Sequence, residues 1–136
     1  NGLVEAILSV TNDVHVLRDP TRGGLTSALN EIAQMAGVGV RLNEASIPIS
    51  EEVKGACEIL GLDPLYVANE GKFLVFASAL DTDRILSAMH THPLGQSAAV
   101  IGDITDEHPG IVVMKTRVGG SRVVDMLAGE QLPRIC

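Results

Sequence analysis

The sequence is poor in aromatic residues and in positive charge. Its 136 residues include no tryptophan, one tyrosine and two phenylalanines, and 10 Lys and Arg stand against 17 Asp and Glu, for a net charge of −7. A nucleic-acid binder needs Lys and Arg facing phosphates, and single-stranded binders also need aromatic rings that stack on bases. The composition therefore argues against nucleic acid as a partner.

Long apolar runs and a cysteine framework are also missing. No apolar stretch approaches the roughly 20 residues that a membrane-spanning helix needs, and no signal segment opens the chain. The two cysteines, Cys57 and Cys136, are too few for a disulfide framework. We therefore expect no membrane partner and a reducing, cytoplasmic setting.

Apolar residues are plentiful, at 46% of the chain, which is enough for one folded domain with its own core. The chain starts at Asn1-Gly2 without Met and runs directly into a helix-like segment, which we interpret as a cut that removed an upstream part. We expect residues 1–127 to form one domain and residues 128–136, which have little periodicity, to form a mobile tail.

Hydrophobic periodicity predicts alternating helices and strands, followed by strands alone. The expected helices cover residues 2–10, 25–36 and 51–60, with a fourth between Asp81, as a cap, and Pro93. The expected strands cover residues 14–17, 38–42, 73–79, 98–104, 111–115 and 121–124. This order favours an α+β sandwich, in which helices cover a mixed β-sheet, over a doubly wound parallel sheet.

We assign structural roles to Cys57 and to the histidine pair. Val53, Ala56, Cys57 and Leu60 share one stripe of the third helix, which predicts a core-facing side and a buried thiol. The pair His90-Thr91-His92 has a spacing that can begin a metal site, but no third ligand is arranged nearby. We therefore predict surface histidines and no metal site.

The segment Arg18–Leu25, with the sequence RDPTRGGL, lies between a predicted strand and a predicted helix. Gly23 and Gly24 let the backbone approach a ligand and leave the first helical N–H groups free for an anion such as phosphate. Arg22 can add a forked contact, and Asp19 can orient a polar group or help to hold a metal. An ordinary helix start, with Thr21 as N-cap and Asp19 paired with an Arg, explains the segment equally well.

A second motif, Asn69-Glu70-Gly71, lies in a loop just before the most β-prone strand. A loop at a strand end can project a carboxylate into a cleft, which makes Glu70 a candidate base. An exposed loop carboxylate is the commoner fate of Glu. Asn69 can likewise hydrogen-bond a substrate amide or simply make a local turn.

The chain closes on Pro133-Arg134-Ile135-Cys136. The ten residues after Met126 span roughly 33 Å when extended, so the thiol of Cys136 can reach a site on this protein or on a partner. Arg134 favours the thiolate, whereas the neighbouring α-carboxylate opposes it. An incidental free cysteine is the alternative.

Together, residues 19–25, Asn30-Glu31, Asn69-Glu70-Gly71 and the closing tetrapeptide resemble the HypE family of hydrogenase maturation factors. That family belongs to the PurM-like superfamily of aminoimidazole ribonucleotide synthetase. The resemblance covers essentially the whole chain, and residues 133–136 are its most specific part. It implies the C-terminal domain of a PurM-like protein, with an N-terminal ATP-binding domain absent from this chain.

The resemblance also implies a chemistry. Cys136 would receive a carbamoyl group from a HypF-like carbamoyltransferase, and the S-carboxamide would be dehydrated with ATP to an S-cyanide for iron on a HypC–HypD-like scaffold. Glu70 would act as the base and Asn69 would position the substrate. ATP and Mg²⁺ would be bound mainly by the missing domain, with a contribution from Asp19, Arg22 and Gly23-Gly24, and the full-length protein would be a homodimer.

Two other functions remain open. The chain can belong to another PurM-like enzyme, such as a selenophosphate or aminoimidazole ribonucleotide synthetase, although those do not close on Pro-Arg-Ile-Cys. It can also be a non-catalytic module that docks a partner. For the isolated fragment we expect folding without dehydratase activity, and weak or no ATP binding.

Overall fold

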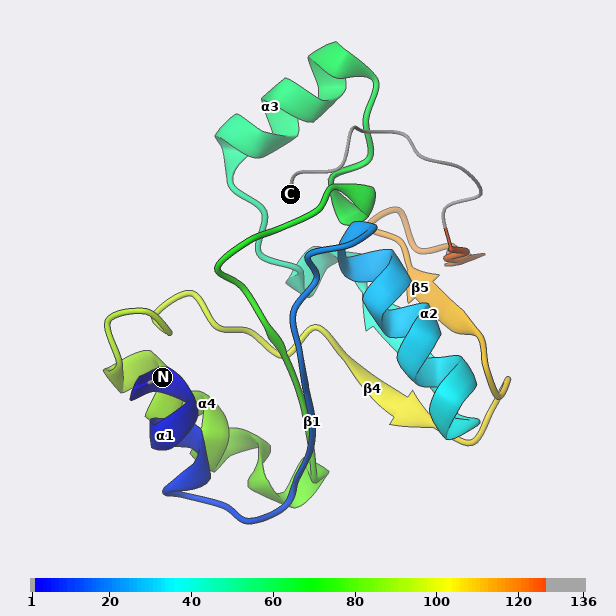
Figure 1. The fold of residues 1–136 in the computed structure, drawn as a ribbon. Coiled ribbons are helices and arrows are strands. Elements are labelled where there is room, and N and C mark those ends of the chain that lie inside the picture. The colour runs from blue at the N-terminus through cyan, green and yellow to red at the C-terminus, as the bar shows by residue number, and fades with distance from the viewer. Residues whose placement is uncertain (1, 127–136) are drawn as a thin grey trace.

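The computed structural model describes residues 2–126 of the chain (Figure 1). Its helices are α1 (Gly2–Leu8), α2 (Gly24–Ala36), α3 (Glu51–Leu60) and α4 (Thr82–Thr91). Its strands are β1 (Val14–Arg18), β2 (Gly39–Asn43), β3 (Leu74–Ala77), β4 (Gly102–Thr105), β5 (Val112–Lys115) and β6 (Ser121–Val123). The tail predicted at residues 128–136 lies outside the described residues, and the domain boundaries stay a prediction.

The strands form a mixed sheet, as predicted. Four of them lie in the order β4-β2-β5-β6, in which β2 and β5 are parallel and the other two pairings are antiparallel. The remaining strands, β1 and β3, pair antiparallel in a separate two-stranded ladder. The expectation of an α+β fold with helices and a mixed sheet is therefore confirmed.

Helix α2 lies against the four-stranded sheet (Figure 1) and forms the main core with it. Alternate residues of a strand point to the same face, so one side of β2 and β5 is apolar. Leu29 and Ala33, one helical turn apart, belong to the same buried cluster as these strand residues. The strand contribution comes from Val40, Leu42, Val112 and Met114.

Helices α1 and α4 pack against each other at another part of the molecule, apart from α2 (Figure 1). Their contact buries Leu3 and Ile7 of α1 and Ile85 of α4. In the range 2–126, no helix has the length and apolar character needed to cross a membrane.

Helix α3 has the predicted bounds, but its predicted burial is wrong for most of the stripe. The Ser50 hydroxyl accepts a hydrogen bond from the Val53 N–H, and Gly61 ends the helix in a left-handed conformation. Of the stripe residues only Cys57 is buried, whereas Leu60 is 68% exposed. The helix stands apart from the sheet (Figure 1) and packs on the short 3-10 turn η2 (Pro64–Tyr66), so only its Cys57 side is covered.

Strand β4 is shorter than predicted and begins at Gly102 rather than Ala98. The Ala98 N–H donates to the Gly95 carbonyl in a turn, which takes it out of any ladder. The pairing of β4 with β2 then runs from Gly102, opposite Leu42, to Thr105. A β-prone sequence becomes strand here only where a partner strand lies alongside it.

Candidate functional site

The fold brings the two sequence motifs together. Strands β1 and β3 are antiparallel, with Arg18 at the end of β1 opposite Leu74 at the start of β3. The segment that follows β1 and the loop that precedes β3 therefore meet at one end of this ladder. The Asn69 N–H donates to the Pro20 carbonyl at 3.0 Å, which joins the loops directly.

Helix α2 starts without a side-chain cap. Gly23 occupies the N-cap position, and both Gly23 and Gly24 have a φ of 66°, in the left-handed region that glycine adopts without strain. The alternative with Thr21 as N-cap is therefore wrong. No side chain competes for the N–H groups of the first turn of α2, where the helix dipole favours an anion.

Gly24 has a packing role of its own. A Cβ at this position would lie 2.5 Å from the Leu65 carbonyl oxygen and 2.8 Å from that of Val67. The space beside Gly24 that was expected to admit a ligand is thus filled by the protein's own backbone. The start of α2 therefore packs closely against the chain that leads to Asn69. Ligand binding at Gly23 and Gly24 stays a prediction.

Three charged side chains of the motifs, Asp19, Arg22 and Glu70, are exposed on the two joined loops. Within residues 2–126, no ion pair involves any of them, so the predicted alternative that pairs Asp19 with an Arg does not form there. The adjacent Arg18 instead pairs with Glu31 of α2, with 2.5 Å between Nη2 and Oε2. That pair ties the end of β1 to α2 and leaves Asp19 and Arg22 accessible.

Asn69 is half-buried and serves the loop itself. Its side-chain Nδ2 donates to the Val67 carbonyl at 3.2 Å, while its backbone N–H holds Pro20. These contacts set the path of the chain into Glu70. They match the local-turn alternative, and a contact of Asn69 with a substrate stays a prediction.

Sequence reasoning did not assign a role to Asn30, on the face of α2 that the structure buries. Its carboxamide Nδ2 donates to the Thr26 carbonyl at 2.9 Å and to the Val124 carbonyl at 2.8 Å. The signal was an amide next to Ala28 and Leu29 in an apolar stripe, where a buried polar group needs partners.

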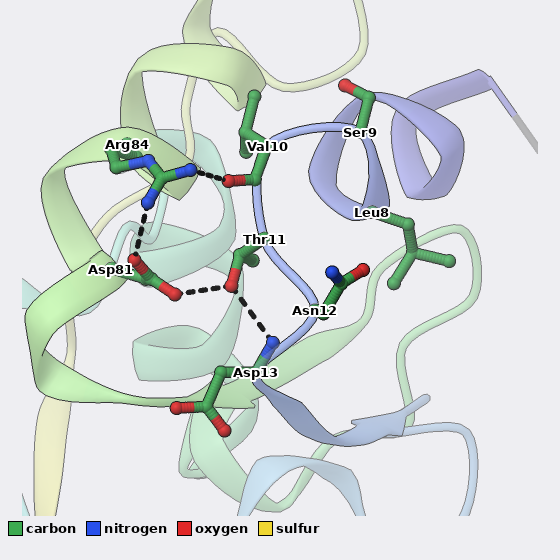
Figure 2. Close-up of a pocket in the computed structure, with 8 residues that line it drawn as sticks. All are labelled: Leu8, Ser9, Val10, Thr11, Asn12, Asp13, Asp81 and Arg84. Carbon is green, nitrogen blue, oxygen red and sulfur yellow. Dashed lines mark hydrogen bonds and ion pairs between the residues drawn. The ribbon is translucent and has the colours of Figure 1, made fainter.

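A concave region of about 480 Å³ lies elsewhere, between the loop after α1 and the start of α4 (Figure 2). Three of its polar side chains, those of Thr11, Asp81 and Arg84, form one network. The Thr11 hydroxyl donates to the Asp81 carboxylate, and Arg84 pairs with Asp81 and donates to the Val10 carbonyl. Asp81 stands at the N-cap position of α4 but makes no capping bond, because its carboxylate is used in this network. The region contains no residue of the two motifs.

The histidine pair has local partners. His90 Nε2 lies 2.8 Å from the Ala98 carbonyl oxygen, and His92 Nδ1 accepts from the Leu94 N–H at 3.2 Å. Across the described range, 2–126, no three His, Cys, Asp or Glu residues are grouped as a metal ion would require. The histidines therefore serve the turn that follows α4.

Comparison with known proteins identifies the family and the fold. Residues 2–115 match the family model described as AIR synthase related protein, C-terminal domain. The carbamoyl dehydratase HypE of Cupriavidus necator is 56% identical over 136 residues, which are 100% of this chain and 39% of that protein. The chain thus spans about two fifths of the length of the relative that it matches.

Solved structures show the same fold. The hydrogenase maturation protein HypE in complex with ATP is 43% identical and has a TM-score of 0.93, over 100% of this chain and 42% of that one. A chain of a HypE–HypF complex is 40% identical with a TM-score of 0.87, over 93% of this chain and 41% of that one. The chain therefore belongs to the family of AIR synthase related C-terminal domains and is similar to the C-terminal part of carbamoyl dehydratase HypE.

Proposed function

We propose that the full-length protein containing this chain dehydrates an S-carboxamide on Cys136 to an S-cyanide, with ATP, for the iron of a [NiFe]-hydrogenase. The observation that carries the proposal is the contact between Asn69 and Pro20, which gathers the exposed side chains of Asp19, Arg22 and Glu70 on two joined loops. The similarity to proteins named carbamoyl dehydratase supports it.

The proposed reaction has two stages. The Cys136 thiol gives up its proton, and its sulfur forms a bond to the carbamoyl carbon while the bond from that carbon to the partner's carrier group breaks and the carrier group leaves. ATP transfers its γ-phosphoryl group to the amide oxygen as one N–H proton leaves, which gives ADP and an O-phosphorylated imidate. Glu70 takes the remaining N–H proton as the C≡N bond forms and the C–O bond to the departing phosphate breaks.

The described residues fit a phosphate group better than a metal ion. Arg22 is exposed beside the uncapped first turn of α2, and a guanidinium with helical N–H groups is a suitable anion site. The part of the chain that the structure describes has no acidic cluster for Mg²⁺. In this proposal Mg²⁺ and most of the ATP contacts belong to the N-terminal domain.

The proposed partners follow from the same similarity. A HypF-like carbamoyltransferase is supported by the solved HypE–HypF complex of a similar protein. A HypC–HypD-like iron scaffold, a homodimer and a cytoplasmic location are proposed from the family resemblance. A terminal thiol suits such a role, since it must visit the protein that loads it and the protein that receives the cyanide.

Mass spectrometry of the full-length protein tests the proposal. With the carbamoyltransferase, carbamoyl phosphate and ATP, Cys136 should gain about 43 Da on carbamoylation and retain about 25 Da after dehydration. Cys136→Ala should remove both adducts. Glu70→Gln should keep the first adduct and slow the second step by about 10²- to 10⁴-fold, as expected for loss of a general base.

Glu58→Gln is the matched control, because Glu58 is an exposed carboxylate on α3 outside both motifs. It should leave both adducts unchanged. ATP turnover that does not depend on Cys136 would favour another PurM-like synthetase. Partner binding that is indifferent to Glu70→Gln and Cys136→Ala, without any adduct, would favour a docking module. Cyanide formation by the isolated 136-residue chain would contradict the proposed need for the N-terminal domain.

A further inference from the structure

Val124 is the last buried residue before the segment that ends in Cys136. It is fully buried, and both of its backbone groups have partners inside the domain. Its N–H donates to the Val112 carbonyl at 2.8 Å, and its carbonyl accepts from Asn30 Nδ2 at 2.8 Å. The chain is therefore held at Val124 by both the N–H and the carbonyl of this residue.

The partner of Val124 is a buried amide that has little freedom. Asn30 is 5% exposed and also donates from Nδ2 to the Thr26 carbonyl, one helical turn earlier in α2. A buried donor that loses its acceptor keeps its desolvation cost without compensation. The hydrogen bond from Asn30 thus ties the chain at Val124 to the same helix that begins at Gly24.

A second contact ties the neighbouring strand to the other motif. Arg122 of β6 pairs with Asp63, with 3.0 Å between Nη2 and Oδ2. The other oxygen of Asp63 accepts from the Leu65 N–H at 2.9 Å, in the turn η2 that leads toward Asn69 and Glu70. The end of the sheet is thus bound to both chain segments whose loops carry the motifs.

We propose that Asn30 is a positioning residue, which clamps Val124 and so fixes where the Cys136 segment leaves the domain relative to Glu70. This rests on the proposed function, since it concerns delivery of the terminal thiol. Ten residues can span at most roughly 33 Å, so the position of Val124 limits which sites Cys136 can reach. A shift of Val124 lowers the effective concentration of the S-carboxamide at Glu70.

The clamp is tested directly by spin-label distances in the full-length protein. Labels are placed at Met35→Cys on α2 and at Met126→Cys, both exposed positions, with the native cysteines replaced by serine. Asn30→Asp, which turns a donor toward the Val124 carbonyl into an acceptor, and Asn30→Ala should each at least double the width of the distance distribution. Asn12→Asp, at an exposed asparagine, should leave it unchanged. Unchanged widths in both Asn30 variants would overturn the proposal.

A kinetic comparison separates positioning from a merely structural role. Single-turnover cyanide formation on the protein's own carbamoylated Cys136 should slow about tenfold or more in Asn30→Ala, as misplacement of a reacting group predicts. In a protein ending at Met126, with a carbamoylated peptide of residues 127–136 added in trans, Asn30→Ala should react at the unaltered rate. Equal slowing in both formats, or none in either, would refute a role through the Cys136 segment.

The two proposals fail in different ways. If the unaltered full-length protein forms no S-cyanide, the proposed function is wrong, and the spin-label widths still decide whether Asn30 clamps the chain. If cyanide forms normally and the widths in the Asn30 variants match those of the unaltered protein, the clamp is wrong and the proposed function stands.

Discussion

Helices α2 and α3 have similar apolar stripes but different places in the fold. Helix α2 buries seven residues, from Gly24 to Ala33, against the sheet and the turn η2. Helix α3 buries only Cys57 and stands away from the sheet (Figure 1). The less buried helix has the more regular start: α3 has a serine side-chain cap, whereas α2 begins with two left-handed glycines and has no side-chain cap.

The difference shows what each helix start is for. A side-chain cap satisfies a helical N–H from within the same turn, so the start of α3 does not depend on a distant segment. The glycine start of α2 stabilises nothing locally, and it is needed because the backbone of residues 65–67 lies against Gly24. The start without a side-chain cap therefore belongs to the helix that packs against both the sheet and η2.

The largest expected effect comes from filling the contact at Gly24. Gly24→Ala adds a Cβ 2.5 Å from the Leu65 carbonyl oxygen at a φ of 66°, so steric overlap and backbone strain add. We expect a loss of about 4 kcal/mol in the free energy of unfolding, measured by urea denaturation. Gly37→Ala is the matched control, because Gly37 is also left-handed but has nothing within 4 Å, and it should lose about 1 kcal/mol. Equal losses would show that the contact with residues 65–67 is unimportant.

Truncation of one leucine on each helix should sharpen the comparison. Leu29→Ala in α2 removes a side chain that is 2% exposed, and should lower the free energy of unfolding by about 3 kcal/mol. Leu60→Ala in α3 removes one that is 68% exposed, and should change it by about 0.5 kcal/mol or less. A large effect of Leu60→Ala in the same denaturation experiment would mean that α3 is packed more closely than the structure shows.

Substitution of the residues at the two helix starts should affect α3 more than α2. Ser50→Ala deletes the hydroxyl that accepts from the Val53 N–H and should destabilise α3 by about 1 kcal/mol. Thr21→Ala should change α2 by no more than about 0.3 kcal/mol, because Thr21 does not cap it. Amide hydrogen exchange within each helix measures the two effects separately. Faster exchange in α2 after Thr21→Ala would show that Thr21 does cap the helix.

The smallest expected effect is the pH dependence of α3. The pKa of Glu52 is lowered from its ordinary value of 4.5 by hydrogen bonds from its own backbone and from Ser50, and that of Glu51 by a hydrogen bond from Lys54 and by its charge. Their contribution is fully present above pH 4.5 and is lost as the pH falls through the lowered values. NMR shifts of α3 should follow this loss, and Glu52→Gln should reduce it. Titration of Glu52 above pH 4.5 would contradict it.

Local rules predicted most of the elements. Periodicity located α2 and α3 to within a residue, and Gly37 and Gly61 end them in the left-handed conformation. The same rules predicted the start of β4 several residues too early, and they wrongly predicted that the apolar stripe of α3 is buried. Both errors concern partners, since neither a ladder nor a covered helix face is determined by one segment alone.

The candidate site divides in the same way. The motifs made Asp19, Arg22 and Glu70 candidates, and the chemistry came from the family resemblance. All three side chains are exposed, and their roles stay predictions. The sequence did not indicate that Pro20 accepts a hydrogen bond from Asn69, or that Asn30 holds Val124. These contacts join segments that are far apart in the chain, and no spacing rule relates them.

The sequence by itself determined the helices, the order of helices and strands along the chain and the motifs, because periodicity and turn residues act within a few residues. Only the tertiary structure decided which helix is buried, why Gly24 must be glycine and what holds the chain at Val124. Those outcomes depend on which distant backbone groups meet, such as the Asn30 amide and the Val124 carbonyl, 94 residues apart. A buried donor needs an acceptor, but only the fold decides which one it finds.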